Sequence, residues 1–565
     1  MRVCCVNGIN SVFKTNVAKK ANNNVAISPF KSDIVSFSSK YVNRPLNVDW
    51  DTAKTVTDSL STSTSGHRAE YGTKVFNEDV VKMLTLGVAD YAKEEAKNNY
   101  PERTPIVLIG GDARKATKES LPIINETLLG QGVEVIYIPE PIPTPALAYA
   151  AKKYDVDAAV LMTASHNPWE DGGYNMVTKE GAIAPASVTK KVANHALNHV
   201  KKGYYKELKN PFAQSSAFSH VIYPYELYKN LIDSHEIIDW EGIKDSNLTI
   251  YYDGLQGAGS NIMPRLLEEK GIPFYEVKSK GQIGPNPTKE NLKMLSRVVK
   301  NSDGEFRIGL SNDGDADRFG VIDENGDFIS TNDVLLLATY HLVHNRGIDG
   351  VLLRSHATSS QLDELAQRYD RPVIDTPVGF KYIGEKILNL RKEGKDILIA
   401  GEESGGLTIN SHVPEKDGIL ATLLIADLVA QEEKPLSQIL KDVKADLSNY
   451  YSAKSINIRL EDNAKKDAIL AKAKDIYNAA MVGENEFGSF EIDAKKTREH
   501  QKHMQEYKQS GDGVKLFFVD GSSVLIRKSG TEPLIRYYIE AIDEDSDVAD
   551  NKVEKIEQTL NEVFV

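Results

Sequence analysis

The chain has 565 residues, of which 41% are hydrophobic and 26% charged, and its formal net charge is −13. This length exceeds what one hydrophobic core supports and indicates roughly three to five domains. The acidic balance argues against a nucleic-acid-binding surface, and no apolar run is long enough to span a membrane. We therefore expect neither nucleic acid nor a membrane as a partner.

Residues 1–48 differ in composition from the rest of the chain. They hold seven basic residues against one acidic residue, Asp33, and show neither a helical nor a strand period. This pattern predicts a disordered tail, with an organelle transit peptide as the alternative. The only cysteines, Cys4 and Cys5, are adjacent and form no disulfide framework, which favours a reducing compartment. A cytoplasmic protein is expected unless the tail is a transit peptide.

From about residue 100, short apolar runs alternate with amphipathic stretches. "PIVLIGG", "VEVIYIP" and "DAAVLM" have the pattern of strands, and the segments between them that of helices. Such βαβα alternation predicts a mostly parallel sheet covered on both faces. The arrangement recurs twice, whereas the last part of the chain alternates like antiparallel strands and closes with an amphipathic helix.

The fold class predicted from this pattern is α/β, with three tandem related mixed-sheet domains followed by an α+β module. The expected divisions are a tail at 1–48, domain 1 at 49–222, domain 2 at 223–345, domain 3 at 346–447 and domain 4 at 448–565. In each α/β unit a strand ends in a polar, glycine-bearing loop, which is where open α/β sheets bind ligands. Ser165 is in the first such loop, as part of either a capped turn or a reactive site.

The second loop carries alternating carboxylates, Asp313, Asp315 and Asp317, followed by Arg318. Carboxylates in a tight loop converge on one point, as a hard divalent cation requires, so we predict a Mg²⁺ site. A solvated acidic turn and a calcium EF-hand are the alternatives. The EF-hand fits poorly, because Arg318 stands where it needs glycine and the flanks look like strands. An arginine beside the carboxylates indicates that phosphate binds there as well.

Two further stretches offer ligand-binding groups. Arg527, Ser529, Gly530 and Thr531 lie within five residues and could cradle a phosphate or simply form a hairpin turn. "GEESGG" at 401–406 presents carboxylates and a hydroxyl, suited to sugar hydroxyls or to capping a helix. His412 and Lys416 follow in "SHVPEKDG".

Taken together, the motifs resemble those of the α-D-phosphohexomutase family of phosphoglucomutases and phosphomannomutases. "TASHNP" is similar to its phosphoserine loop, "DGDADR" to its metal loop, "GEESGG" to its sugar-binding loop and "RKSGTEPLIR" to its phosphate-binding loop; "TSGHR" resembles its first motif, with Arg68 facing substrate. The resemblance implies four domains around a central cleft, the last of them a lid. It implies interconversion of hexose 1- and 6-phosphates through a phosphoserine at Ser165, with Mg²⁺ as cofactor and hexose 1,6-bisphosphate as activator.

The resemblance also implies roles for particular residues. The metal ligands would be Ser165, Asp313, Asp315 and Asp317, and the catalytic residues Ser165, His166, Lys416, Arg68 and Arg318. Substrate would be bound by Lys381, Glu402, Ser404, His412, Arg527, Ser529, Gly530, Thr531 and Arg536.

The chain departs from the family pattern at several positions. Gly406 stands where members acting on both glucose and mannose often have histidine, and Asn175 where many have lysine; Gly172-Gly173 and Ala69 also differ. These departures argue against the family's usual acid/base assignment. "SHVPEKDG" and "RSHATSS" instead resemble phosphoglucomutase segments, in which the lysine of the Glu-Lys-Asp-Gly run lies at the reacting hydroxyl. The resemblance therefore implies Lys416 as the first candidate for acid/base catalysis and His166 as the second.

Several functions remain open at this stage. Glucose phosphate is the expected substrate, ahead of mannose phosphate and glucosamine phosphate. The alternatives in other classes are a phosphatase with Asp313 as nucleophile and an inactive sugar-phosphate sensor.

Overall fold

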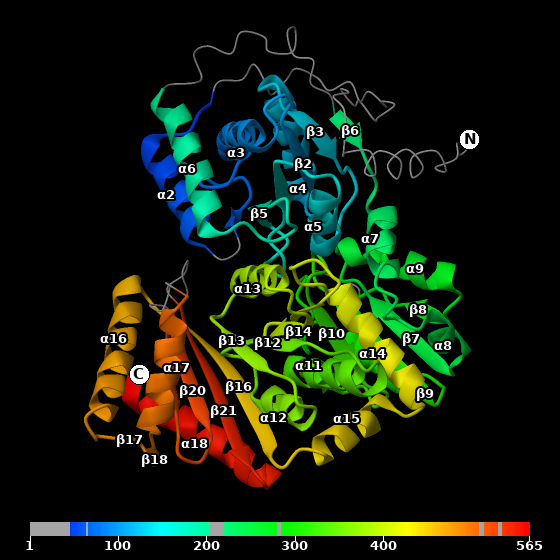
Figure 1. The fold of residues 1–565 in the computed structure, drawn as a ribbon, viewed down its shortest axis with the longest axis vertical. Coiled ribbons are helices and arrows are strands. Elements are labelled where there is room, and N and C mark those ends of the chain that lie inside the picture. Colours follow the sequence, from blue (N-terminus) through cyan, green and yellow to red (C-terminus); the bar gives the residue numbers. More distant parts are fainter. Residues whose placement is uncertain are drawn as a thin grey trace.

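The computed structural model describes residues 46–63, 66–202, 219–279, 284–507, 513–528 and 534–564. Figure 1 shows domain 1 at the top, domains 2 and 3 below it, and the C-terminal module at the lower left. No helix of the described ranges has both the length and the apolar character that crossing a membrane requires.

Domain 1 is a six-stranded mixed sheet in the order β1-β5-β4-β2-β3-β6. Alternate residues of its central strands face different cores: Val107 and Val160 face one, Leu108 and Leu161 the other. This two-sided burial explains the continuous apolar runs in the sequence. Its elements are α2 (Trp50–Thr62), β1 (His67–Glu70), α3 (Glu78–Asn99), β2 (Ile106–Gly111), α4 (Lys115–Gly130), β3 (Glu134–Tyr137), α5 (Thr144–Lys153), β4 (Ala158–Met162), β5 (Asp171–Val177), α6 (Ala186–Lys201) and β6 (Ser219–Val221).

Domain 2 is a five-stranded sheet in the order β11-β10-β9-β7-β8. Its elements are α7 (Pro224–Asp233), α8 (Trp240–Asp245), β7 (Leu248–Asp253), η4 (Ala258–Asn261), α9 (Met263–Lys270), β8 (Phe274–Glu276), α10 (Lys293–Lys300), β9 (Phe306–Asn312), β10 (Phe319–Ile322) and β11 (Phe328–Ile329).

Domain 3 is a four-stranded sheet in the order β13-β12-β14-β15. Its elements are α11 (Thr331–Tyr340), η5 (His341–Asn345), β12 (Val351–Ser355), α12 (Gln361–Arg368), β13 (Val373–Thr376), α13 (Phe380–Lys392), β14 (Ile397–Glu402), β15 (Gly406–Ile409), α14 (Gly418–Glu432) and α15 (Leu436–Ala445). Helix α11 packs against α12, α14 and β14. We therefore place the boundary between domains 2 and 3 before Thr331 rather than after residue 345.

The C-terminal module is a four-stranded antiparallel sheet, β16-β21-β20-β19, with helices on one face. Its elements are β16 (Tyr450–Arg459), α16 (Asn463–Ala480), β17 (Glu486–Phe487), β18 (Phe490–Glu491), α17 (Ala494–Gln505), β19 (Gly513–Phe517), β20 (Ser523–Lys528), β21 (Leu534–Asp543) and α18 (Ser546–Phe564). Ile526 and Ile535 point into its core, so their neighbours Arg527 and Arg536 lie on the face away from that core.

The three α/β domains repeat one arrangement at their functional loops. In each, a strand that pairs in parallel inside the sheet is followed by an antiparallel neighbour: β4 by β5, β9 by β10, and β14 by β15. The loops that join these pairs contain Ser165, the three aspartates and Glu403, respectively. The three functional loops therefore occupy equivalent positions in the three related domains.

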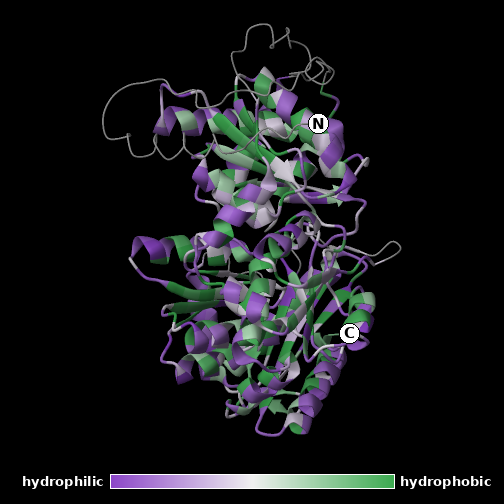
Figure 2. Ribbon diagram, turned by 90° about the vertical axis from the view of Figure 1, so that its right-hand side faces the viewer, coloured by the Kyte–Doolittle hydropathy of each residue, from purple (hydrophilic) through white to green (hydrophobic). Residues whose placement is uncertain are grey.

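Hydropathy follows this architecture, because the strands are predominantly hydrophobic and hydrophilic residues are concentrated on helices and connections (Figure 2). The tail predicted for residues 1–48 lies outside the described residues as far as residue 45. Its last three residues do not fit that prediction, because Leu46 is buried in the core of domain 1 and Val48 packs against the same core. Apolar contact with the domain orders this end of the segment.

Candidate active site

The serine loop, residues 163–168, begins directly after β4. Ser165 adopts a left-handed backbone with a φ of 52°, which is uncommon for a residue with a side chain. Its amide donates to Thr163 Oγ1 at 2.8 Å, and its hydroxyl donates to Asp313 Oδ2 at 2.9 Å. The side chain is only 1% exposed, so the hydroxyl lies beneath the cleft surface, against the aspartates of domain 2.

Arg114 holds the serine loop in this conformation, a role that the sequence analysis missed. Its buried guanidinium donates to the backbone carbonyls of Ser165, Asn167, Pro168 and Asp171. Asp112 pairs with Arg114 at 2.8 Å and accepts a hydrogen bond from Thr163 at 2.7 Å. The signal was present in "GGDAR", which begins with the last two residues of β2 and leaves the sheet at the same edge as the serine loop.

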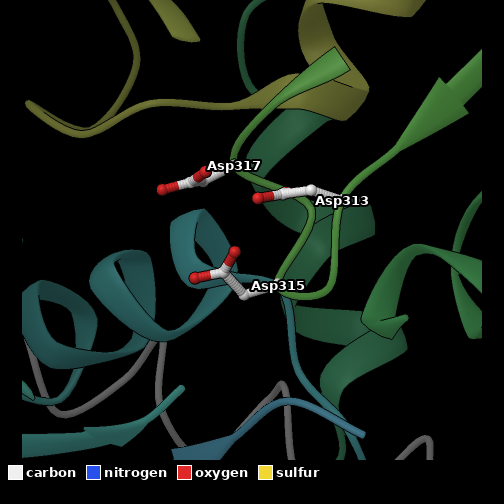
Figure 3. Close-up of side chains that lie close together, drawn as sticks. All are labelled: Asp313, Asp315 and Asp317. Carbon is white, nitrogen blue, oxygen red and sulfur yellow. The ribbon is translucent and has the colours of Figure 1, made fainter. Parts of the chain in front are cut away.

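The aspartate triad, Asp313, Asp315 and Asp317, occupies the loop between β9 and β10, and its carboxylates converge (Figure 3). One oxygen of each lies within 4.8 Å of the others, and all three residues are buried. Oδ1 of Asp315 and Oδ1 of Asp317 have no hydrogen-bond donor. Buried carboxylate oxygens without donors suit a divalent cation. The strands on both sides of the loop exclude the EF-hand alternative, which needs helices.

The charges of the aspartate triad are only partly compensated by the chain. Burial, together with its two acidic neighbours, raises the pKa of Asp313 well above its usual value, and burial and Asp317 raise the pKa of Asp315 to about 6. Burial raises the pKa of Asp317 less than Lys416 and Arg318 lower it, so its net shift is downward. The loop therefore has a strong preference for added positive charge.

Cationic side chains surround the triad. Arg68 lies on β1 and donates to the carbonyl of Ala164 at 3.2 Å. Arg318 Nε lies 3.8 Å from Asp317 Oδ1, and Lys416 Nζ lies 2.7 Å from Asp317 Oδ2. Arg318 and burial hold the pKa of His166 well below its usual range, so this imidazole is neutral at pH 7.

Domain 3 contributes Lys381, Glu402 and Ser404 to the cleft wall, as the sequence predicted. Glu402 accepts a hydrogen bond from the amide of Gly379 at 2.6 Å. Burial and the neighbouring Glu403 raise the pKa of Glu402 to about 7, so this carboxyl can donate as well as accept hydrogen bonds near neutral pH.

The C-terminal module contributes the arginine pair, Arg527 and Arg536, which stand directly opposite each other on β20 and β21. Two like charges in such a cross-strand position repel, and an anion between them removes the repulsion. Both residues line the cleft, and Arg536 Nε is buried and has no acceptor among the described residues. The predicted ligands Ser529, Gly530 and Thr531 lie outside the described residues.

His412 is the predicted substrate contact that the structure contradicts. Its Nε2 lies 2.8 Å from Asp417 Oδ2 and its Nδ1 lies 2.7 Å from His235 Nε2, so both ring nitrogens are used within the fold. The residue is buried and does not line the cleft. Sequence reasoning also missed Glu415, which is buried at the cleft wall and whose pKa burial raises to about 7.

The cationic side chains, two members of the aspartate triad (Asp315 and Asp317) and the carboxyl groups of domain 3 line one cleft of about 720 Å³. Its wall includes residues from every domain, among them Arg68 and His166 from domain 1, Asp315 from domain 2, Lys381 from domain 3 and Arg527 from domain 4. A cation-rich cleft with a carboxylate floor and a buried serine defines an enzyme that acts on phosphate esters.

The comparisons with known proteins specify this class. Models of the four domains of the phosphoglucomutase/phosphomannomutase family match residues 59–202 (domain I), 226–326 (domain II), 330–446 (domain III) and 456–557 (the C-terminal domain). The chain therefore belongs to the phosphoglucomutase/phosphomannomutase family, whose members are isomerases that move a phosphoryl group within a sugar phosphate.

Individual relatives agree with this membership. A phosphoglucomutase/phosphomannomutase of Thermococcus kodakarensis is 29% identical over 83% of this chain and 93% of its own length. A phosphoglucosamine mutase of Caldicellulosiruptor bescii is 30% identical over 78% of this chain and 87% of its own length. The crystal structure of a Thermus thermophilus putative phosphomannomutase has the same fold, with a TM-score of 0.67 and 22% identity over 89% of this chain and 99% of its own.

Proposed function

We propose that this protein interconverts hexose 1-phosphate and hexose 6-phosphate through a phosphoserine at Ser165, with glucose phosphate as the preferred substrate. The observation that carries the proposal is the 2.9 Å contact between Ser165 Oγ and Asp313. Both residues are buried, on loops that also carry His166 and Asp315, which line the same cleft as the arginine pair. The cluster around Ser165 and Asp313 is suited to the phosphate that reacts, and the arginine pair to the phosphate that does not.

In the proposed cycle, the phosphoryl group on Ser165 passes to the free hydroxyl of the sugar phosphate. The bond between phosphorus and Ser165 Oγ breaks as the sugar oxygen bonds to phosphorus. A base takes the proton of the sugar hydroxyl, and Ser165 Oγ takes up a proton as it leaves. The bisphosphate then turns in the cleft, and its other phosphate returns to Ser165. The arginine pair binds whichever phosphate is not reacting, and Arg318 offsets charge on the one that is.

The ligands proposed for Mg²⁺ are the aspartate triad and Ser165. The ion would offset the charge of the transferring phosphoryl group. Lys416 is the proposed proton carrier. Burial is the largest influence on its pKa and lowers it, but the acidic groups Asp317, Glu415 and Glu402 together outweigh burial and Arg318. The net pKa of Lys416 is raised, so it holds a proton to donate to the departing sugar oxygen. His166 is the second candidate.

The phosphoserine proposal is tested by intact-mass and peptide analysis of protein treated with glucose 1,6-bisphosphate. We expect a phosphate on Ser165 that is stable to hydroxylamine. An acyl phosphate on Asp313 would instead support a phosphatase. The substrate proposal is tested by the relative turnover of glucose, mannose and glucosamine 1-phosphates, and faster turnover of either of the last two would overturn it.

A further inference from the structure

Gly406 and Lys416 occupy nearly the same space in the cleft wall. Gly406 is the first residue of β15 and pairs with Glu402 across the sugar-binding hairpin. A Cβ at Gly406 would lie 2.5 Å from Lys416 Cγ, closer still to Lys416 Cδ, and 3.0 Å from Lys416 Cβ. Carbon atoms do not approach so closely, so the stem of Lys416 fills the place of a side chain at position 406.

The backbone at Gly406 does not itself require glycine. Gly406 is absent from the described glycines with positive φ, whereas its neighbour Gly405 has a φ of 99°. Any residue could adopt the conformation of position 406, so the absence of a side chain matters there for space alone.

The backbone that directly follows Lys416 is held by hydrogen bonds, which oppose a shift of the chain that would make room. The amide of Asp417 donates to the carbonyl of Leu407 at 2.8 Å, and the amide of Gly418 donates to the carbonyl of Ala316 at 3.0 Å. The Asp417 carboxylate also accepts hydrogen bonds from Tyr228, at 3.0 and 2.9 Å. A new side chain at 406 can therefore be accommodated only if the Lys416 side chain turns away.

We propose that Gly406 is a positioning residue: it leaves open the path by which the Lys416 side chain crosses β15 and reaches Asp317 and the substrate. This inference rests on the proposed function where it gives Lys416 a catalytic role, but the packing relation is independent of that role. Lys416 and a side chain at position 406 are mutually exclusive within this fold.

The test compares Gly406→Ala, Lys416→Ala and the double variant, with Gly284→Ala as the matched control. Among the described residues, a Cβ at Gly284 meets only Asn291 Nδ2, at an ordinary 3.5 Å, so this control makes the same chemical change without a clash there. Two quantities are measured: the rate at which Lys416 reacts with an amine-modifying reagent, followed by peptide mass spectrometry, and the steady-state kinetics.

We expect Lys416 to react with the reagent severalfold faster in Gly406→Ala than in the parent protein or the Gly284→Ala control. We also expect it to lower kcat on the order of a hundredfold, the lower range for loss of acid/base catalysis, with a smaller change in KM. The double variant should be no slower than Lys416→Ala, because the two changes act through one side chain.

The outcomes separate this inference from the proposed function. Parent-rate labelling of Lys416 in folded Gly406→Ala overturns the inference. If Lys416→Ala keeps full activity, the acid/base proposal fails, while faster labelling in Gly406→Ala still supports the packing relation. If Gly406→Ala does not fold, recovery of folding in the double variant supports the inference, and an unfolded double variant overturns it.

Discussion

The aspartate triad and the arginine pair have opposite charges and different degrees of burial, and each is suited to a different part of a phosphate-binding site. The triad is buried, on one tight loop, and its carboxylates repel one another until a cation arrives. The arginine pair is partly exposed, on two strands of a separate module, and its guanidinium groups repel until an anion arrives. In the proposed cycle, the first region positions the transferring phosphoryl group, and the second reversibly binds either end of the substrate.

This comparison predicts that damage to the triad lowers the chemical rate most. Asp315→Asn should lower kcat by roughly a hundredfold or more, because losing one carboxylate weakens Mg²⁺ and removes a few kcal/mol of charge stabilisation. The measurement is kcat with saturating glucose 1,6-bisphosphate over a Mg²⁺ titration. Full activity in excess EDTA would show that the triad needs no metal.

A substitution in the arginine pair should instead change both substrate binding, measured as KM, and the catalytic rate, measured as kcat. Arg527→Ala removes a charged hydrogen bond to phosphate, about 1.5 to 3 kcal/mol, and so raises KM, while poorer closure lowers kcat. It should also increase the demand for added glucose 1,6-bisphosphate, because the intermediate escapes more often. Phosphate on Ser165 should remain; its loss with an unchanged KM would contradict the proposed role.

Candidate residues for both regions could be selected from the sequence for a physical reason. Strand ends, alternating carboxylates and clustered phosphate ligands are local patterns, and the repeated β–loop–β arrangement turns local patterns into a shared site. His412 was predicted wrongly because its partners His235 and Asp417 are set by tertiary packing. The contacts of Arg114 with the serine loop and of Lys416 with Gly406 depend on side-chain conformations in the folded protein. The spacing of residues in the sequence does not predict them.

The electrostatics of the triad predict that metal stabilises the protein more at higher pH. The pKa of Asp315 is raised from 3.8 to about 6, so its proton stabilises the metal-free fold at low pH, and this contribution is lost as pH rises through about 6. Above that pH, bound Mg²⁺ would offset the charge of the Asp315 carboxylate that the proton neutralised. The rise in Tm on adding Mg²⁺ should be a few degrees larger at pH 7.5 than at pH 5, and this difference should shrink in Asp315→Asn. An equal rise at both pH values would contradict the prediction.

The smallest effect on activity and stability is expected from deleting the N-terminal segment, residues 1–45, which precedes both the aspartate triad and the arginine pair. The composition of residues 1–45 predicts no packed core, so their deletion should change neither kcat/KM nor Tm. Deletion of residues 1–48 is the matched variant, because it also removes the buried Leu46 and the packed Val48. It should lower Tm through lost apolar burial and leave kcat/KM intact, since both phosphate-handling regions lie downstream. Thermal melts and kinetics of the two truncations measure the difference. A loss of activity in the shorter deletion would show that the first 45 residues support the cleft.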